Sequence, residues 1–377
     1  MKSYCIFAAQ YLPHMGGVEN YTYNLSKKLI EKGNKVIVVT NQNGDLPAYE
    51  VMEGITIYRL PCLSLMNGRY PILKCNKEFR KINRILKKKH FDMVIVNTRF
   101  YIHSVYGARF AKKQGIPCII LDHGSTHLTV HNRLFDVLGG WVEHFLTMIV
   151  KHYCRDFYGV SMASVEWLKH FHIEGKGTIY NAIDLGKINQ TLENPVKDYR
   201  NEYGIPEDGV VVTFTGRLIK EKGILQLIQA VKRINRINDK VYLFLAGDGD
   251  EEETVARESN KNIIPLGRLS FEEVIALLRQ SDIFDLPSDS EGFPTSVLEA
   301  VACHCYIIVT ERGGAKELIA GDAFGTVIPD NNPDTVYESL FDCINHGEQR
   351  KIAEENAYKR LKENFTWDIV SDKVLEL

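Results

Sequence analysis

The feature of this sequence that most restricts its fold is an alternation of short β-rich runs and helical periods, which occurs twice along the 377 residues. Residues 3–40 contain an apolar run, a Gly-Gly loop, a helical period and a second apolar run. This order of strand, loop, helix and strand opens a parallel, doubly wound sheet. The pattern restarts at residue 210, after a polar stretch from 181 to 208 that we interpret as a linker region. We therefore predict two α/β domains of similar size.

Charge differs between the two halves of the chain. Residues 1–185 contain 24 Lys and Arg against 14 Asp and Glu, whereas residues 186–377 contain 22 against 34. The net charges of +10 and −12 indicate that the first half faces an anionic partner. A predicted helix over residues 74–90 is rich in Lys and Arg and has an apolar stripe. It is either an ordinary surface helix or a contact with an anionic membrane surface through Lys74–Lys89.

Composition also narrows the class of protein. The eight cysteines form no C-x-x-C pair, which favours buried or free thiols in a reducing compartment. The chain begins without the features of a signal peptide, and no apolar window reaches the roughly 20 residues of a membrane span. We expect a cytoplasmic protein, peripheral at the inner face of the membrane if the basic helix binds lipid, with no nucleic-acid partner.

The stretch with the most candidate chemistry is E-G-F-P-T-S-V-L-E, at residues 291–299. Pro294 is suited to the first turn of a helix, so Glu291 is expected in the preceding loop and Glu299 in the second turn. The backbone N–H groups of residues 293–296 would suit a phosphate, and each carboxylate can accept hydrogen bonds from two neighbouring sugar hydroxyls. The stretch could hold a sugar nucleotide at both ends, although such glutamates are also common as solvated surface groups.

Other candidate residues fall in loops that follow predicted strands. Because parallel strands present their carboxyl ends to the same edge of a sheet, these loops are expected to border one crevice. Each feature alone has a simpler interpretation as a turn glycine, a structural histidine or a surface charge. His127 and His131 are weaker candidates and are interpreted as polar surface. The loop features are Gly16-Gly17, His123, Arg217 with Lys222, Gly267, Glu291 with Glu299, and Gly313-Gly314.

Several segments of the sequence resemble the retaining glycosyltransferases of family 4, also described as glycosyl transferases group 1. The resemblance implies an α/β architecture of the GT-B type, with two Rossmann-like, doubly wound parallel-sheet domains facing each other across a cleft. It places an acceptor-side domain at 1–184, a nucleotide-sugar domain at 185–360 and a helix returning to the first domain at 361–377. The matching segments are G-G-V-E-N-Y at 16–21, G-R-L-I-K-E-K-G at 216–223, A-G-D-G at 246–249, L-G-R-L-S at 266–270, S-D-S-E-G-F-P-T-S-V-L-E-A at 288–300 and G-G-A-K-E-L-I at 313–319.

The resemblance implies roles for individual residues. Arg217 and Lys222 would bind the donor diphosphate, Glu299 the ribose hydroxyls, and Glu291 the donor sugar, with His123 beside that sugar. His123, Arg217, Lys222 and Glu291 would be the catalytic set. Members of the family need no metal, so neither a metal nor another cofactor is expected. The other donor-binding residues would be Gly16, Gly17, Gly267, Arg268, Leu269, Gly292, Phe293, Pro294 and Thr295.

The sequence departs from the family pattern at four positions. Ala182 and His304 stand where glycine is usual, Tyr306 where proline is usual, and Asp285 in a strand position that is usually apolar. These changes leave the proposed cations and carboxylates in place, so they put local details in question rather than the class of protein.

The expected reaction moves a hexosyl or N-acetylhexosaminyl group from a nucleotide diphosphate sugar, with UDP favoured over GDP, to an acceptor hydroxyl. The acceptor would be a lipid-linked glycan or glycolipid in polysaccharide assembly. No carboxylate is placed as an obvious nucleophile, so front-face attack assisted by the leaving phosphate is favoured. The alternatives are a sugar-nucleotide epimerase on the same fold and a silent nucleotide-sugar-binding partner subunit.

Overall fold

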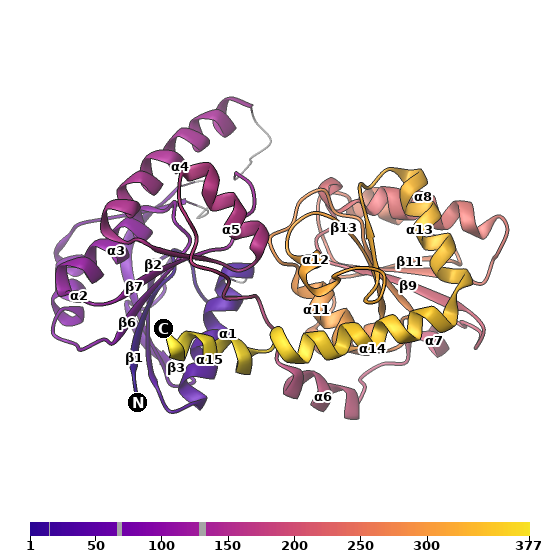
Figure 1. Cartoon of the computed structure of the whole chain (residues 1–377), viewed down its shortest axis with the longest axis horizontal. Coiled ribbons are helices and arrows are strands. Elements are labelled where there is room, and N and C mark those ends of the chain that lie inside the picture. The colour runs from indigo at the N-terminus through magenta and orange to yellow at the C-terminus, as the bar shows by residue number, and fades with distance from the viewer. Residues whose placement is uncertain (15, 66–69, 128–132) are drawn as a thin grey trace. The chain divides into compact units, whose positions relative to one another are not determined.

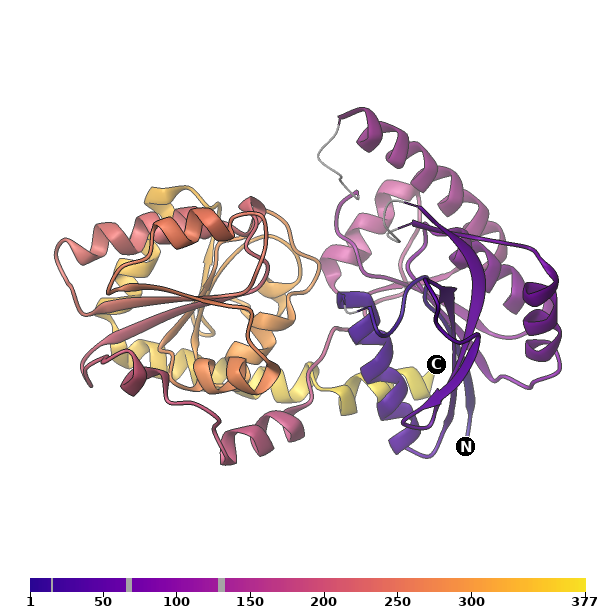
Figure 2. The ribbon, with the colours of Figure 1, turned by 180° about the vertical axis from the view of Figure 1, so that it is seen from behind.

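The computed structural model describes residues 1–14, 16–65, 70–127 and 133–377, which form two compact units (Figure 1; Figure 2). The first unit contains Met1–Asn181 and Trp367–Leu377, and the second contains Ala182–Thr366. The sequence had placed the ends of the domains at 184 and 360. In the structure, the last helix alone, α15 (Trp367–Glu376), belongs to the first unit, whereas α14 (Gly347–Asn364) lies in the second.

The first unit is built on one twisted sheet, whose described strands follow the order β3-β4-β2-β1-β6-β7-β8. All neighbours on this path are parallel except β3, which is antiparallel to β4, and β5 also pairs antiparallel with β4. After β8, Thr178 adds only an isolated parallel bridge to Gly159. The strands are β1 (Ser3–Phe7), β2 (Lys35–Gln42), β3 (Tyr49–Met52), β4 (Ile55–Leu65), β5 (Tyr70–Leu73), β6 (Met93–Asn97), β7 (Cys118–Asp122) and β8 (Asp156–Gly159).

Helices cover both faces of this sheet. In the first unit α2, α3 and α4 pack on one face, and α1 and α15 lie together on the other (Figure 1). The helix predicted over residues 74–90 is shorter, because the Asn76 side chain caps its start by accepting the Phe79 N–H at 2.9 Å. Phe79, Ile82 and Leu86 are buried in the core, so its apolar stripe serves packing. The helices are α1 (Gly17–Glu31), α2 (Lys77–Leu86), α3 (Ile102–Gln114), α4 (Arg133–Tyr153), α5 (Met162–Leu168) and the 3-10 turn η1 (Lys169–Phe171).

The second unit contains a fully parallel sheet in the order β11-β10-β9-β12-β13-β14. Helices α8 and α13 pack together on one face, and α10, α11 and α14 cover the other (Figure 1). The strands are β9 (Val210–Thr215), β10 (Val241–Ala246), β11 (Ile263–Gly267), β12 (Ile283–Leu286), β13 (Tyr306–Thr310) and β14 (Thr326–Ile328). The helices are η2 (Lys220–Lys222), α8 (Ile224–Asn235), α9 (Glu252–Arg257), α10 (Phe271–Arg279), α11 (Thr295–Ala302), α12 (Ala315–Leu318) and α13 (Pro333–Asn345).

The polar stretch at 181–208, which we interpreted as a linker region, begins at the boundary of the two units but is largely part of the second one. This stretch contains the helices α6 (Leu185–Glu193) and α7 (Tyr199–Glu202). Asp184 caps α6 by accepting the Lys187 N–H at 2.9 Å, and Asp198 caps α7 in the same way. A capping carboxylate satisfies a donor that a short helix otherwise leaves unpaired, and buried apolar side chains then hold each helix to the unit.

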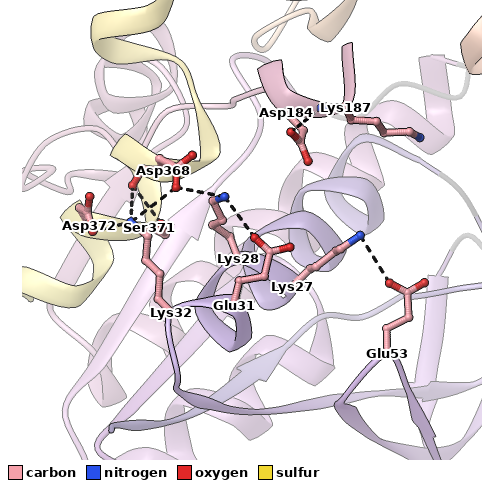
Figure 3. A network of polar contacts seen from close by, with 10 residues as sticks. All are labelled: Lys27, Lys28, Glu31, Lys32, Glu53, Asp184, Lys187, Asp368, Ser371 and Asp372. Carbon is pink, nitrogen blue, oxygen red and sulfur yellow. Dashed lines mark hydrogen bonds and ion pairs between the residues drawn. The ribbon is translucent and has the colours of Figure 1, made fainter. Parts of the chain in front are cut away.

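The helix α15 is attached to α1 by an aromatic contact with ion pairs beside it. The rings of Tyr21 and Trp367 meet edge to face with centroids 5.1 Å apart, and both side chains are buried. Lys28 pairs with Asp368 at 3.0 Å and Lys32 with Asp372 at 2.5 Å (Figure 3). Because exposed ion pairs contribute little, we attribute most of the attachment to the buried aromatic pair.

Replacing Trp367 with alanine should therefore destabilise the first unit by about 3–5 kcal/mol, the usual cost of emptying a buried tryptophan site. The matched control is Ile369→Ala in the same helix; this side chain is 43% exposed, and its removal should cost about 0.5 kcal/mol or less. The loss of stability is measured by urea unfolding, followed by the fluorescence of Trp141 and Trp167, because both tryptophans lie in the first unit. Equal unfolding midpoints for the two variants would contradict the assignment.

Candidate active site

Three loops of the second unit meet at the carboxyl ends of adjacent strands. The loops follow β9, β12 and β13, which are neighbours in the sheet. The Asp289 N–H donates to the Glu221 carbonyl at 2.7 Å, and the Gly314 N–H donates to the Gly292 carbonyl at 2.7 Å. The Ser288 hydroxyl donates to the Glu221 carbonyl at 3.0 Å. The features that the sequence singled out in these loops are therefore brought together by backbone contacts.

Two glycines allow this close approach. Gly223 and Gly313 have φ values of +69° and +68°, in the left-handed region that favours glycine. A Cβ on Gly223 would lie 2.0 Å from the Pro287 carbonyl oxygen, and one on Gly313 would lie 2.3 Å from the Glu291 carbonyl oxygen. Any side chain at either position would force the loops apart.

Lys222 and Glu291 form a hydrogen-bonded ion pair across two of these loops. Their side chains are only 17% and 10% exposed, so each charge is largely withdrawn from water and depends on the other. Arg217, five residues before Lys222, is exposed. Of these two cations, Lys222 is paired with a carboxylate and Arg217 faces solvent.

The helix α11 begins next to this ion pair. Pro294 is its N-cap, with φ −71° and ψ 118°, so the helix starts at Thr295 and not at the proline as expected. The N–H groups of Thr295 and Ser296 belong to the first turn, where an α-helix offers them no internal acceptor. The ring of Phe293 packs on Phe365 with centroids 5.2 Å apart and is buried, so only the backbone of this predicted donor-binding residue can reach a ligand.

Glu299 is half-buried in α11. Burial raises the pKa of its carboxyl group to about 7, and the positive charge of Lys187 opposes this shift. Lys187 also lies over the ring of Phe271, 3.9 Å from its centroid. The sequence reading missed Lys187 because it treated this stretch as a linker; the available signal was Asp184 as a helix cap before the apolar spacing of Leu185 and Ile188.

The end of β11 and the residues after it contain a left-handed glycine and an exposed arginine. Gly267 has a φ of +67°, and Arg268 is exposed, 3.7 Å from a carboxylate oxygen of Asp248. Leu266 and Leu269 pack partly against a hydrophobic cluster of this unit. The backbone near Gly267 and the Arg268 side chain are therefore more open to a ligand than the two leucine side chains.

In the first unit, Gly16 and Gly17 lie at the start of α1, after the strand β1. The buried carboxylate of Glu19 accepts backbone hydrogen bonds from Gly16 and from Glu19 itself, while burial raises its pKa. A Cβ on Gly16 would lie 2.4 Å from a carboxylate oxygen of Glu19, whereas nothing lies within 4 Å of one on Gly17. The helix start already holds one anionic group, which the sequence reading missed, and the open space lies beside Gly17.

His123 is half-buried just after β7. Its Nε2 lies 3.1 Å from Oδ1 of Asn97, and Nδ2 of Asn97 donates to the Thr22 hydroxyl at 2.7 Å. With Oδ1 as acceptor, Nε2 carries the proton and Nδ1 has a free lone pair. Burial lowers the pKa of His123 to about 3, so the ring is neutral near pH 7. It can accept a hydroxyl proton in a hydrogen bond but carries no charge.

A network of buried ion pairs includes Asp122, the residue before His123. Arg99 pairs with Asp122 at 2.5 Å and with Glu143, and all three side chains are buried. The sequence reading missed this network, although Asp122 directly precedes His123. His127, interpreted as polar surface, is half-buried and lies 2.7 Å from Glu143. His131 lies outside the described residues.

The structure shows the surroundings of His304 and Asp285, two of the residues that depart from the family pattern. His304 follows the end of α11 with a φ of +62°, a conformation in which glycine is less strained, and its ring stacks on Tyr358 with centroids 4.3 Å apart. Asp285 is fully buried in β12, and burial raises its pKa well above the ordinary value. Within the described part of the chain, neither of its carboxylate oxygens has a hydrogen-bond partner.

Comparison with known proteins agrees with this architecture. Residues 15–187 match the family model described as Glycosyltransferase Family 4, and residues 195–360 match Glycosyl transferases group 1. An uncharacterized glycosyltransferase of Methanocaldococcus jannaschii is 27% identical, over 96% of this chain and 94% of its own. The gpi3 subunit of phosphatidylinositol N-acetylglucosaminyltransferase from Schizosaccharomyces pombe is 24% identical, over 96% of this chain and 77% of its own. The structure of Anabaena HepE with UDP has a TM-score of 0.75 at 17% identity, covering 100% of this chain and 99% of that one.

The two α/β units, each built on a largely parallel sheet, have the GT-B fold. The chain belongs to the glycosyl transferases group 1, with an N-terminal half of the family 4 type.

Replacing Gly313 with alanine should reduce glycosyl transfer on the order of 100-fold, because the new Cβ must displace the backbone of Glu291. The matched control is Gly204→Ala in the same unit, where φ is +62° but nothing lies within 4 Å of the added Cβ. That variant should lose only about 1–2 kcal/mol of stability from backbone strain and keep its turnover. Comparable turnover in the two variants, both checked for folding by circular dichroism, would show that loop spacing does not matter.

Proposed function

We propose that this glycosyltransferase transfers a hexosyl or N-acetylhexosaminyl group from a UDP-sugar to a hydroxyl of a lipid-borne acceptor, with retention of anomeric configuration and without a metal. The observation that carries the proposal is the ion pair of Lys222 and Glu291 in the loops before α11, with Arg217 in the same loop as Lys222 and Glu299 on α11 itself. Cations and helix N–H groups suit a diphosphate, and carboxylates suit sugar hydroxyls.

The leaving diphosphate gains negative charge as its bond to the anomeric carbon breaks. Arg217, Lys222 and the first-turn N–H groups of α11 would stabilise that charge. Lys222 would then be shared between the phosphate and Glu291, whose pairing keeps the cation in place before the donor binds. Because Glu291 is engaged in this pair, we favour attack by the acceptor oxygen on the face that the leaving group departs from. The hydroxyl proton would pass to the leaving phosphate oxygen.

The remaining polar groups would orient the donor. Glu299 would accept hydrogen bonds from the two ribose hydroxyls, and Glu291 from the sugar. In the first unit, the neutral ring of His123 and the free lone pair on its Nδ1 suit a hydrogen bond from a sugar hydroxyl. The backbone near Gly267 and the Arg268 side chain would face the base.

UDP is favoured as the nucleotide, with GDP as the alternative. The solved structures of HepE that resemble this chain contain UDP, UDP with glucose, or UDP-glucose. Relatives of fungal and plant origin are named as phosphatidylinositol N-acetylglucosaminyltransferase subunits, so an N-acetylglucosamine donor and a lipid acceptor are the first pair to test.

An exposed apolar surface of the first unit supports the proposal that the acceptor is lipid-borne. The helix α4 exposes a row of apolar side chains, including Trp141, which is 74% exposed. An amphipathic helix with such a face can lie in the membrane interface, and the basic residues of Lys74–Lys89 add attraction to anionic lipid. None of the helices in the described ranges is long and apolar enough to cross a membrane. The exposed row consists of Val137, Leu138, Trp141, Val142, Phe145 and Met148.

Calorimetric titration with UDP, GDP and ADP, without added metal, tests the donor site. Selective binding of UDP is expected, and Arg217→Ala should weaken it by about 10- to 100-fold, as befits the loss of charged hydrogen bonds. Lys220→Ala in the same loop is the matched control, because this side chain is 79% exposed and its loss should change affinity by about twofold or less. Equal weakening by the two variants, or no binding of any nucleotide, would refute the assignment.

The affinity for UDP should also rise with pH. The pKa of Glu299 is about 7 in the free protein, so the carboxylate that accepts ribose hydroxyls becomes the major form only above that pH. From pH 6 to 8 the affinity of the wild type, divided by that of Glu299→Gln, should increase by up to about tenfold. The titration of UDP itself cancels in this ratio. A ratio that is constant with pH would mean that the ionised form of Glu299 is not required.

A further inference from the structure

Three histidine rings converge in the first unit, outside the loops that we assign to the donor. His127 follows β7, His144 lies on α4, and His170 lies in η1. Nε2 of His170 is 3.2 Å from Nε2 of His127 and 3.1 Å from Nε2 of His144. One ring nitrogen from each of the three residues lies within 4.8 Å of the others. Three segments distant in sequence thus direct imidazole nitrogens to one place.

The spacing of these nitrogens fits a metal ion. Zinc binds histidine nitrogen at about 2.0–2.1 Å with tetrahedral geometry, which puts neighbouring ligand nitrogens about 3.3 Å apart. The two measured separations, 3.2 Å and 3.1 Å, are close to that value. Nδ1 of His127 lies 2.7 Å from a carboxylate oxygen of Glu143, which places the proton on Nδ1 and leaves the lone pair on Nε2.

The surrounding residues hold the rings in position. The ring of Trp167 stacks on that of His170, with centroids 4.7 Å apart and an angle of 4° between the planes. The ring centroids of Phe171 and His144 are 4.6 Å apart. Glu143 is itself fixed, because it also accepts a hydrogen bond from the buried Arg99. A carboxylate that orients a ligating histidine is the usual outer support of a metal site. The arrangement is therefore organised before any ion binds.

The cluster is also accessible. A surface hollow of about 740 Å³ is lined by all three histidines together with Asp136 and Trp141 of α4. His144 and His170 are exposed, so an ion can reach the nitrogens from solvent and retain a water molecule in the remaining position.

We propose that His127, His144 and His170 bind one divalent transition-metal ion of the zinc class, with the fourth position facing the hollow. Imidazole ligands suit zinc, copper and nickel, and zinc is the ion to which the tetrahedral spacing points. The ion would tie the loop after β7, α4 and η1 to one another. The metal site would also be linked to the end of β7, next to His123, through the ion pairs that Arg99 forms with Glu143 and Asp122. The expectation of a metal-free reaction concerns the donor and does not extend to this cluster.

Equilibrium dialysis of the full, tag-free chain against Zn²⁺, under reducing conditions and after chelator treatment, tests the proposal. The wild type should bind one ion, and His170→Ala and His144→Gln should each weaken binding by at least about tenfold. His152→Ala is the matched control, because this exposed histidine also lies on α4 but outside the cluster, and it should bind as the wild type does.

Substitution with Co²⁺ supplies a readout that does not depend on affinity. The wild type and His152→Ala should show the intense visible absorption of tetrahedral cobalt, and His144→Gln should lose it. Circular dichroism confirms folding; because His144 is exposed, this variant keeps the test valid if His170→Ala fails to fold. Absence of zinc binding by the wild type, or equal binding by His144→Gln and the wild type, would overturn the proposal.

Discussion

The second unit depends on backbone segments approaching one another without intervening side chains. Gly223 lies against the Pro287 carbonyl and Gly313 against the Glu291 carbonyl. This contact sets the distance between the loops after β9, β12 and β13, and hence the distance between Lys222 and Glu291. It also fixes where α11 begins relative to that ion pair. The chemistry proposed for the donor rests on glycine geometry more than on any single hydrogen bond.

The candidate functional groups of the free protein are mostly neutral or balanced. Lys222 is paired with Glu291, and the Glu19 carboxylate is held at the start of α1. The pKa values of Glu299 and His123 are shifted by burial toward their neutral forms. Because an isolated buried charge is costly, this arrangement stabilises each unit by leaving none of these groups as an unpaired buried charge. A bound diphosphate would have to share Lys222 with Glu291, whereas the exposed Arg217 is open to it, and both features favour a ligand of matching charge and shape.

Much of the fold could be predicted because buried parallel strands are continuous apolar runs ended by Gly, Pro or polar residues, and β9, β10, β12 and β13 are runs of this kind. The short strands β3 and β5 lie outside that signal. Candidate residues could be identified where one loop carries several of them. Contacts between different elements could not be predicted: Lys187 near Glu299, and the three histidines from the segment after β7, from α4 and from η1. Such contacts follow from packing, which a local sequence pattern does not encode.

The position of α15 has a consequence for the order in which the chain acquires its structure during synthesis. The first unit is discontinuous, because its last helix is made only after all of Ala182–Thr366 has been translated. Until Trp367 has been made, the ring of Tyr21 on α1 lacks this aromatic contact and keeps the one with His123, whose ring centroid lies 4.9 Å away. The ribosome therefore completes the second unit while the first still exposes apolar surface. A chain that stops short of α15 therefore carries a complete second unit joined to a first unit that lacks its last helix.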